Sequence, residues 1–556
     1  MKYSWWSYGT QMAILLVLLG VAHRPLGMYL HWVVEGAVLE GKAGEGTRQN
    51  RVERVLFRMA GVSPEREQNW LGYARGVLAF SILSVLVVFL AMRLQALFST
   101  EGLGAVDPWT AMNTAISFVT NTNWQVYTPE TTVGIAVQMV LLAVQNFLSA
   151  AVGICVAVAF MRGLTRAGTD RLGNFWKDLV RISLRFLLPL AAVSAVLLIV
   201  AGVVQNFWAT PVHNPYTGAA QVVPGGPVAS QEAIKLLGTN GGGYFNANSA
   251  HPLENPNSFT NLFEVFLLLV IPSVLPWVFG RMARDARQGY TVLGVMGSLW
   301  LLTSTAMAWA LAAYPGLGEG MEQRLGPAAS GVFATATTLT STGAVNAAHD
   351  SLPPLAGGVA LFDMMLGEVA PGGVGSGLYG ILVLAIVTVF LAGLMVGRTP
   401  EYLGKKVQAK HMTLTALYLL VVPIVVLVLT GIAVMIPGVL SQASAQGPHQ
   451  FSEMLYAFTS AANNNGSAFG GITSSGPALS TMLGIAMWLG RFVGIVLILA
   501  LAGAFVTQAV VPKSAGTLPT HGGLFAIMFG TVTVLLTALN YLPALALGPL
   551  AEGILK

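Results

Sequence analysis

Charged side chains are scarce in this chain. Only 9% of its 556 residues are Asp, Glu, Lys or Arg, whereas 54% are hydrophobic. Soluble domains carry about 25% charged residues, so this composition excludes a soluble globular protein and predicts an all-α polytopic membrane protein. The net charge of +5 is small for this length, and we expect no nucleic-acid partner.

Cysteine is nearly absent, and this absence excludes a disulfide within the chain. The single cysteine, Cys155, lies in an apolar run. A thiol in such a setting is expected to be a small core residue.

The signatures of ATP chemistry are also lacking. No aspartate is followed by Lys-Thr-Gly, the phosphorylation motif of P-type ATPases. Residues 36–42 match the first part of a phosphate-binding loop, but Ala43 stands where the magnesium-binding Ser or Thr is required. We therefore expect that this chain binds no nucleotide and is not catalytic by itself.

Long apolar runs are abundant and predict about ten membrane spans. They lie near residues 4–22, 77–98, 132–161, 183–204, 261–280, 292–313, 377–397, 414–437, 482–511 and 524–547. The first run has no convincing cleavage site after it, and we interpret it as a retained span rather than a signal peptide.

Basic residues gather in alternate loops, chiefly within residues 24–75, 162–185, 281–287 and 398–410. The positive-inside rule places these loops in the cytoplasm. Both termini are then predicted to be extracytoplasmic.

Four polar turns recur in the other loops at intervals of roughly 100–120 residues. Each follows a short helix-prone run, so the pattern is span, half-helix, turn, span. The runs are predicted to begin at Asp107-Pro108, Ser230, Ser330 and Ser452. The implied units are an extra span at 1–30, repeats at 70–165, 175–285, 290–400 and 410–511, and an extra span at 520–556.

The chemistry of the turns points to a monovalent cation. They offer hydroxyl, amide and carbonyl oxygens and contain no carboxylate, which calcium and magnesium sites use. Asn123 stands where the other turns have Gly241, Gly343 and Gly466, and Asn tolerates the left-handed backbone best after Gly. Four half-helices whose negative C-terminal ends converge predict a pseudo-fourfold cation pore in one chain.

The sequences of the turns resemble those of a known family. They read Thr120-Asn121-Thr122-Asn123-Trp124-Gln125, Gly238-Thr239-Asn240-Gly241-Gly242-Gly243, Ser341-Thr342-Gly343-Ala344-Val345-Asn346 and Ala461-Ala462-Asn463-Asn464-Asn465-Gly466. These motifs resemble the potassium-binding A subunits of bacterial Kdp potassium-transporting ATPases. The resemblance runs from the first span to the last.

The resemblance implies four span–pore-helix–span repeats around one potassium selectivity filter, in the bacterial inner membrane. It implies as partners a P-type ATPase subunit, a single-span accessory subunit and a small membrane peptide, besides membrane lipids. K+ is the transported ion, held at the filter only and passed through a tunnel to the ATPase. The expected filter residues are Asn121, Thr122, Asn123, Thr239, Asn240, Gly241, Ser341, Thr342, Gly343, Asn464, Asn465 and Gly466.

Three residues outside the turns complete the hypothesis. Gln125 is expected to line the outer mouth. The resemblance suggests that the seventh span is broken below the filter as a gate, and we hypothesise that Arg398 and Arg491 form a charge barrier there. Two alternatives stay open: a stand-alone Trk- or Ktr-like channel or symporter, and a broken-helix transporter of an organic solute.

Overall fold

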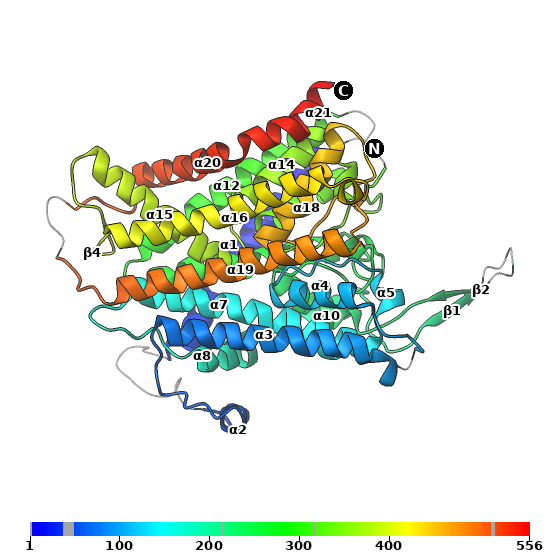
Figure 1. Ribbon diagram of the computed structural model, residues 1–556, viewed down its shortest axis with the longest axis horizontal. Coiled ribbons are helices and arrows are strands. Elements are labelled where there is room, and N and C mark those ends of the chain that lie inside the picture. The colour runs from blue at the N-terminus through cyan, green and yellow to red at the C-terminus, as the bar shows by residue number, and fades with distance from the viewer. Residues whose placement is uncertain are drawn as a thin grey trace.

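Long helices form the body of the molecule, which we describe from a computed structural model (Figure 1). The structure describes residues 3–36, 49–99, 101–213, 216, 218, 220–314, 319–474, 476–512 and 517–555. Within these residues, ten helical segments are long and apolar enough to cross a membrane. All ten overlap the predicted spans, so that prediction is confirmed.

The spans follow one another along the chain with few interruptions. They are α1 (Trp5–Glu35), α3 (Trp70–Leu94) with η1 (Gln95–Leu97), α6 (Ile135–Val137) with η2 (Gln138–Leu142) and α7 (Ala143–Thr165), α8 (Phe175–Arg181) with η3 (Ile182–Leu187) and α9 (Leu188–Val200), α11 (Ser258–Met282), α12 (Ala286–Ala312), α15 (Ser376–Met395), α16 (Ala409–Met435), α19 (Pro477–Val506), and α20 (Gly523–Leu545) with η6 (Ala546–Leu550) and α21 (Ala551–Leu555).

Four short helices lie between pairs of long ones, as the sequence predicts: α4 (Pro108–Val119), α10 (Val228–Leu237), α13 (Pro327–Leu339) and α18 (Pro448–Asn463). Asp107 caps α4 as expected, since its Oδ1 accepts a hydrogen bond from the Trp109 backbone N–H at 3.0 Å. The four helices and the turns that follow them are largely buried. Irregular backbone at membrane depth is tolerated in such surroundings, because protein encloses it.

The predicted starts of the other three short helices are wrong. Ser230, Ser330 and Ser452 lie inside α10, α13 and α18 rather than at their first residues. α13 and α18 begin at a proline, and α10 begins directly after one. Proline has no N–H to satisfy in the first turn and its fixed φ suits a helix start, so these helices begin without a serine cap.

The remaining elements are small. They are α2 (Arg51–Met59), α5 (Pro129–Thr132), α14 (Pro354–Met365), α17 (Pro437–Leu440), the single turns η4 (Asn248–Ala250) and η5 (His349–Ser351), and the antiparallel pairs β1 (Thr210–His213) with β2 (Ala220–Val223) and β3 (Glu401–Tyr402) with β4 (Lys405–Lys406). The sequence match to a phosphate-binding loop lies outside the described residues, except for Gly36.

Both chain termini lie at one end of the bundle, where the β1–β2 hairpin also projects, β4 lies at the opposite end, and α2 lies to one side of the bundle, below α3 and α8 in the view (Figure 1). Helices α4 and α10 lie toward the end with the hairpin. The basic loops and the polar turns are therefore separated along the long axis of the helices, as the alternation of charge in the sequence predicts.

Glycines let the short helix α18 pack tightly against its neighbour α19. A β-carbon on Gly490 would lie only 1.9 Å from the backbone oxygen of Ala462, near the end of α18. Small residues allow such close approach of helix backbones in a membrane. This contact fixes the position along α19 at which the fourth turn begins.

Candidate functional site

The backbone makes the same change of direction after each short helix. The first residue with a positive φ after each short helix is not a glycine: Asn121 (69°), Thr239 (45°), Ser341 (51°) and Asn464 (61°). Asn tolerates this left-handed conformation, whereas Thr and Ser adopt it at a cost. Its recurrence after all four short helices shows that the four turns begin with the same bend.

A second left-handed residue follows two positions later in three of the turns. It is Asn123 (58°), Gly343 (74°) and Gly466 (106°), which agrees with the expected tolerance of Asn123. The expectation that Gly241 shares this conformation is wrong, because in the second turn the left-handed residue is Gly242, at 68°. The extra glycine moves the second bend one residue along the chain.

The four turns converge at Gly241. A β-carbon on Gly241 would lie 2.5 Å from the Thr122 oxygen, 2.9 Å from the Thr342 oxygen and 3.1 Å from the Asn465 oxygen. These are backbone carbonyls from the other three turns. Carbonyl oxygens that surround one position can together replace the water around an alkali cation. The geometry therefore suits a dehydrated cation.

Side-chain amides hold the first two turns together. The Asn240 side-chain amide donates to Asn121 Oδ1 at 2.9 Å and to Asn123 Oδ1 at 3.0 Å. The Asn121 amide in turn donates to the Thr239 backbone oxygen at 2.9 Å. All four residues are buried, so these bonds fix the positions of the turns in a medium where unpaired amides are costly.

A carboxylate that the sequence analysis missed joins the other two turns. Glu368 is 1% exposed, and its Oε1 accepts a hydrogen bond from the Asn465 side-chain amide at 2.8 Å. Its Oε2 accepts a short hydrogen bond from the Ser341 hydroxyl. The sequence feature that could have identified Glu368 is its position as a carboxylate within residues 366–375, a glycine-rich break between two apolar helices. No turn contains a carboxylate itself, but the Glu368 carboxylate supports the third and fourth turns.

A cavity of about 430 Å³ lies on one side of the turns. Its lining includes Asn123, Gln125, Gly343 and Gly466. Gln125 also spans two turns, since its Oε1 accepts from the Gly243 backbone N–H at 3.0 Å and its Nε2 donates to the Gly243 oxygen at 3.2 Å. Gln125 thus lines this cavity and contacts the second turn, and its role at the outer mouth stays a prediction.

A second cavity, of about 320 Å³, extends from other residues of the turns. Its lining includes Ser341 and Asn464 of the turns and Thr533 and Tyr541 of α20. It is bordered by residues from α15, α16, α19 and α20. The two cavities share no lining residue, and they meet different residues of the same turns.

The chain breaks between α14 and α15, at residues 366–375, and this break packs beneath the turns. The Val374 backbone N–H donates to Thr239 Oγ1 at 3.0 Å. A β-carbon on Gly375 would lie 2.1 Å from the Gly153 backbone oxygen of α7. The break therefore lies in contact with both the second turn and a neighbouring span. It precedes the predicted seventh span rather than interrupting it.

The two predicted barrier arginines lie in different surroundings. Arg491 is 5% exposed, lines the second cavity, and donates from Nη2 to the Ser149 backbone oxygen at 3.2 Å. Arg398 is exposed, follows the end of α15 and does not line that cavity. The structure thus brings Arg491, but not Arg398, to the cavity beside the turns.

Comparison with known proteins gives consistent matches over the whole chain. A model of the family described as "Potassium-transporting ATPase A subunit" matches residues 13–554. The chain is 54% identical to the potassium-transporting ATPase potassium-binding subunit of Mycobacterium avium (strain 104), 52% to that of Clavibacter michiganensis and 51% to that of Streptomyces coelicolor. In each case 98% of both chains is covered.

The fold is also found among solved structures. One of them is the potassium transporter TrkH from Vibrio parahaemolyticus, with a TM-score of 0.54 and 15% identity, covering 88% of this chain and 98% of that one. The similarity extends over nearly the whole bundle, which supports the architecture of repeated spans and half-helices.

Proposed function

This chain belongs to the family of potassium-transporting ATPase A subunits, and we therefore propose that it binds potassium where its four polar turns converge. The observation that supports this site is the approach of three backbone carbonyls, from Thr122, Thr342 and Asn465, to Gly241. Carbonyl oxygens can replace the water around an alkali cation. The filter residues expected from the sequence all lie in these turns, and we propose them as the filter.

The chain is a transport subunit rather than the catalytic one. The ion enters by the mouth at Gln125, passes the turns and reaches the cavity beside α20. We expect the ATPase partner to receive it there and to carry out all nucleotide binding and hydrolysis. A single-span accessory subunit, a small membrane peptide and lipids are further expected partners.

The helices and the charge distribution support a proposal for the location of the chain. Ten apolar helices make it a multi-pass membrane protein. The termini and the basic loops lie at opposite ends of the bundle (Figure 1), and basic loops favour the cytoplasm. We propose the bacterial plasma membrane with both termini outside, and the four repeats bounded as 70–165, 175–285, 290–400 and 410–511.

A Trk- or Ktr-like channel is the alternative with a comparable pore. The similarity to TrkH is at 15% identity and concerns the fold. Identity above 50% over whole chains links this protein instead to subunits of an ATPase. The half-helices end in turns rich in neutral oxygen atoms, which favours a cation over an organic anion.

Purification in mild detergent from the native cells tests the pump. We expect a stoichiometric P-type ATPase to accompany this chain, with ATP hydrolysis stimulated by potassium and not by sodium. Mass spectrometry and an ATPase assay supply the readouts. A soluble nucleotide-binding ring in place of the ATPase would favour the channel alternative.

Neutralising the buried arginine tests the proposed barrier. A positive charge beside the ion path raises the energy of a cation there, so Arg491→Gln is expected to increase potassium leak through liposomes about tenfold. Arg398→Gln is expected to have a smaller effect, because water and salt screen an exposed charge. If neither Arg491→Gln nor Arg398→Gln leaks potassium, the charge-barrier hypothesis is wrong.

A further inference from the structure

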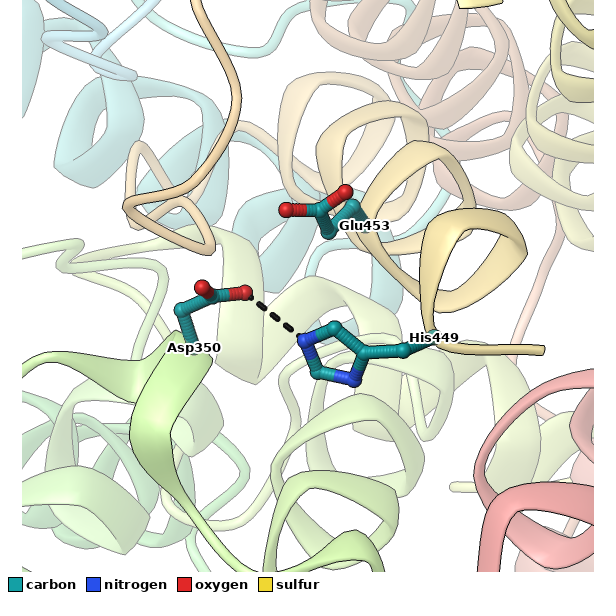
Figure 2. Close-up of side chains that lie close together, drawn as sticks. All are labelled: Asp350, His449 and Glu453. Atoms are coloured by element: carbon teal, nitrogen blue, oxygen red, sulfur yellow. Dashed lines mark hydrogen bonds and ion pairs between the residues drawn. The ribbon is translucent and has the colours of Figure 1, made fainter. Parts of the chain in front are cut away.

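Three side chains with metal-ligand atoms lie together beside the third and fourth turns. They are Asp350, His449 and Glu453, whose ligand atoms all lie within 4.8 Å of one another. Figure 2 shows the three side chains directed toward one another. His449 and Glu453 are four residues apart on α18, which puts them on one face of the helix. Asp350 comes from η5, just after the third turn.

Glu453 is a buried carboxylate without a basic partner. Its side chain is 0% exposed, and it accepts hydrogen bonds from the Ser444 hydroxyl at 2.9 Å and the Ala445 backbone N–H at 3.2 Å. Among the described residues, no Lys, Arg or His nitrogen lies within 4.0 Å of its oxygens. Buried charges are usually paired or bound to a metal, so a cation bound here would supply the ion pair that Glu453 lacks.

The His449 ring is held in the orientation typical of a metal ligand. Its Nδ1 lies 2.9 Å from Glu552 Oε2, and its Nε2 lies 3.0 Å from Asp350 Oδ1. A carboxylate on one ring nitrogen commonly orients a histidine whose other nitrogen binds metal. Glu552 belongs to α21, so the C-terminal helix supplies this orienting group.

The space between the carboxylates exists because residue 471 is glycine. A β-carbon there would lie 2.2 Å from Glu453 Oε1, 2.2 Å from Ser444 Oγ and 2.9 Å from Asp350 Oδ2. Oxygens from three residues thus surround one small region beside the Gly471 backbone. Gly471 does not have a positive φ, so glycine is needed here for space rather than for its backbone conformation.

We propose that Asp350, His449 and Glu453 bind a divalent transition-metal ion, Zn²⁺ or Mn²⁺, with Glu552 orienting the histidine. One imidazole nitrogen with carboxylate oxygens suits these ions, whereas calcium and magnesium prefer oxygen ligands alone. The side chains of Asp350 and His449 are 24% and 22% exposed, so an ion can enter from solvent.

The residue before Asp350 in the chain, His349, is linked to the fourth turn by hydrogen bonds. His349, beside Asp350, has its Nδ1 2.8 Å from the Tyr456 hydroxyl, which lies 2.9 Å from the Ser467 hydroxyl. Ser467 donates to Asn465 Oδ1 at 2.5 Å. We infer that metal occupancy changes potassium affinity through this path. That part of the inference depends on the proposed function, whereas metal binding does not.

The test uses the whole complex, purified with a tag that contains no histidine, stripped with chelator and kept free of nucleotide. Equilibrium dialysis against Zn²⁺ or Mn²⁺ with elemental analysis measures bound metal. We expect wild type to hold one more ion per complex than His449→Gln and Glu453→Gln, with affinity reduced at least about tenfold in the variants. Equal binding by all three proteins would overturn the site.

Two further variants distinguish loss of the site from misfolding of the protein. Gly471→Ala keeps every ligand but puts a methyl group between the oxygens, so it is expected to lose the ion as well. His251→Gln removes a histidine that stacks on Phe245 at 4.0 Å outside the cluster, and it is expected to bind like wild type. Loss of binding in His251→Gln would overturn the assignment.

Potassium binding is then measured with and without Zn²⁺. A shift in potassium affinity in wild type, absent in Glu453→Gln, supports the link to Asn465. Metal binding with unchanged potassium affinity overturns the link alone. Failure to bind potassium under either condition, with metal binding intact, counts against the proposed function rather than against the metal site.

Discussion

Gly241→Ala is expected to lower the affinity for potassium about 100-fold, equivalent to ~2.7 kcal/mol. The added methyl group would lie 2.5 Å from the Thr122 carbonyl oxygen and 2.9 Å from that of Thr342. These contacts are too short, so the carbonyls must move apart. Gly241 does not have a positive φ, so alanine adds little backbone strain and the effect is steric.

Potassium-stimulated ATP hydrolysis by the purified complex measures this change, with rubidium and sodium as competitors. We expect half-maximal stimulation at a correspondingly higher potassium concentration and an altered order among the three ions. Gly470→Ala is the matched control, because a β-carbon there meets nothing within 4 Å. Wild-type affinity in Gly241→Ala would contradict the filter assignment.

Glu368→Ala is expected to weaken potassium binding about 30-fold, because each buried partner left without its hydrogen bond costs about 1–3 kcal/mol. The variant removes the acceptor of the Ser341 hydroxyl and one of the two acceptors of the Asn465 amide, which keeps its bond to the Thr337 backbone oxygen. Ser341 and Asn465 both belong to the turns. The third and fourth turns then lose the group that joins them, and the unfolding temperature falls as well.

Thermal unfolding and potassium-dependent ATP hydrolysis separate these effects. Asp363→Ala is the control, since this buried carboxyl accepts from Thr338 Oγ1 at 3.1 Å and contacts no turn residue through a described hydrogen bond. We expect it to lower stability without changing potassium affinity. If Glu368→Ala destabilises the protein equally but binds potassium like wild type, Glu368 does not support the filter.

The spans and the turns could be predicted because their signals are local. Crossing a membrane requires about twenty consecutive apolar residues, and each of the ten segments contains them. The turns stand out as polar, small-residue stretches between such segments. Their fourfold recurrence made a pore the natural prediction before any contact was known.

Helix starts and some turn details were harder to predict, although they are local. Serine and proline both favour a helix start, and the sequence alone did not decide between Ser330 and Pro327. The turn conformations at Gly241 and Gly242 also differ from the expectation. In both cases neighbouring residues can begin the helix or adopt the left-handed conformation at similar energy, and tertiary packing selects which residue does so.

Contacts between distant residues were decided by the tertiary structure. Glu368 and Asn465 are 97 residues apart, and Asp350 and His449 are 99 apart. Hydropathy and turn composition describe each segment separately and contain no information on which segments meet. The sequence by itself determined a membrane bundle with four oxygen-rich turns. Only the folded chain brings Glu368 to two of the turns and Arg491 to a cavity, because close packing joins side chains that no sequence spacing connects.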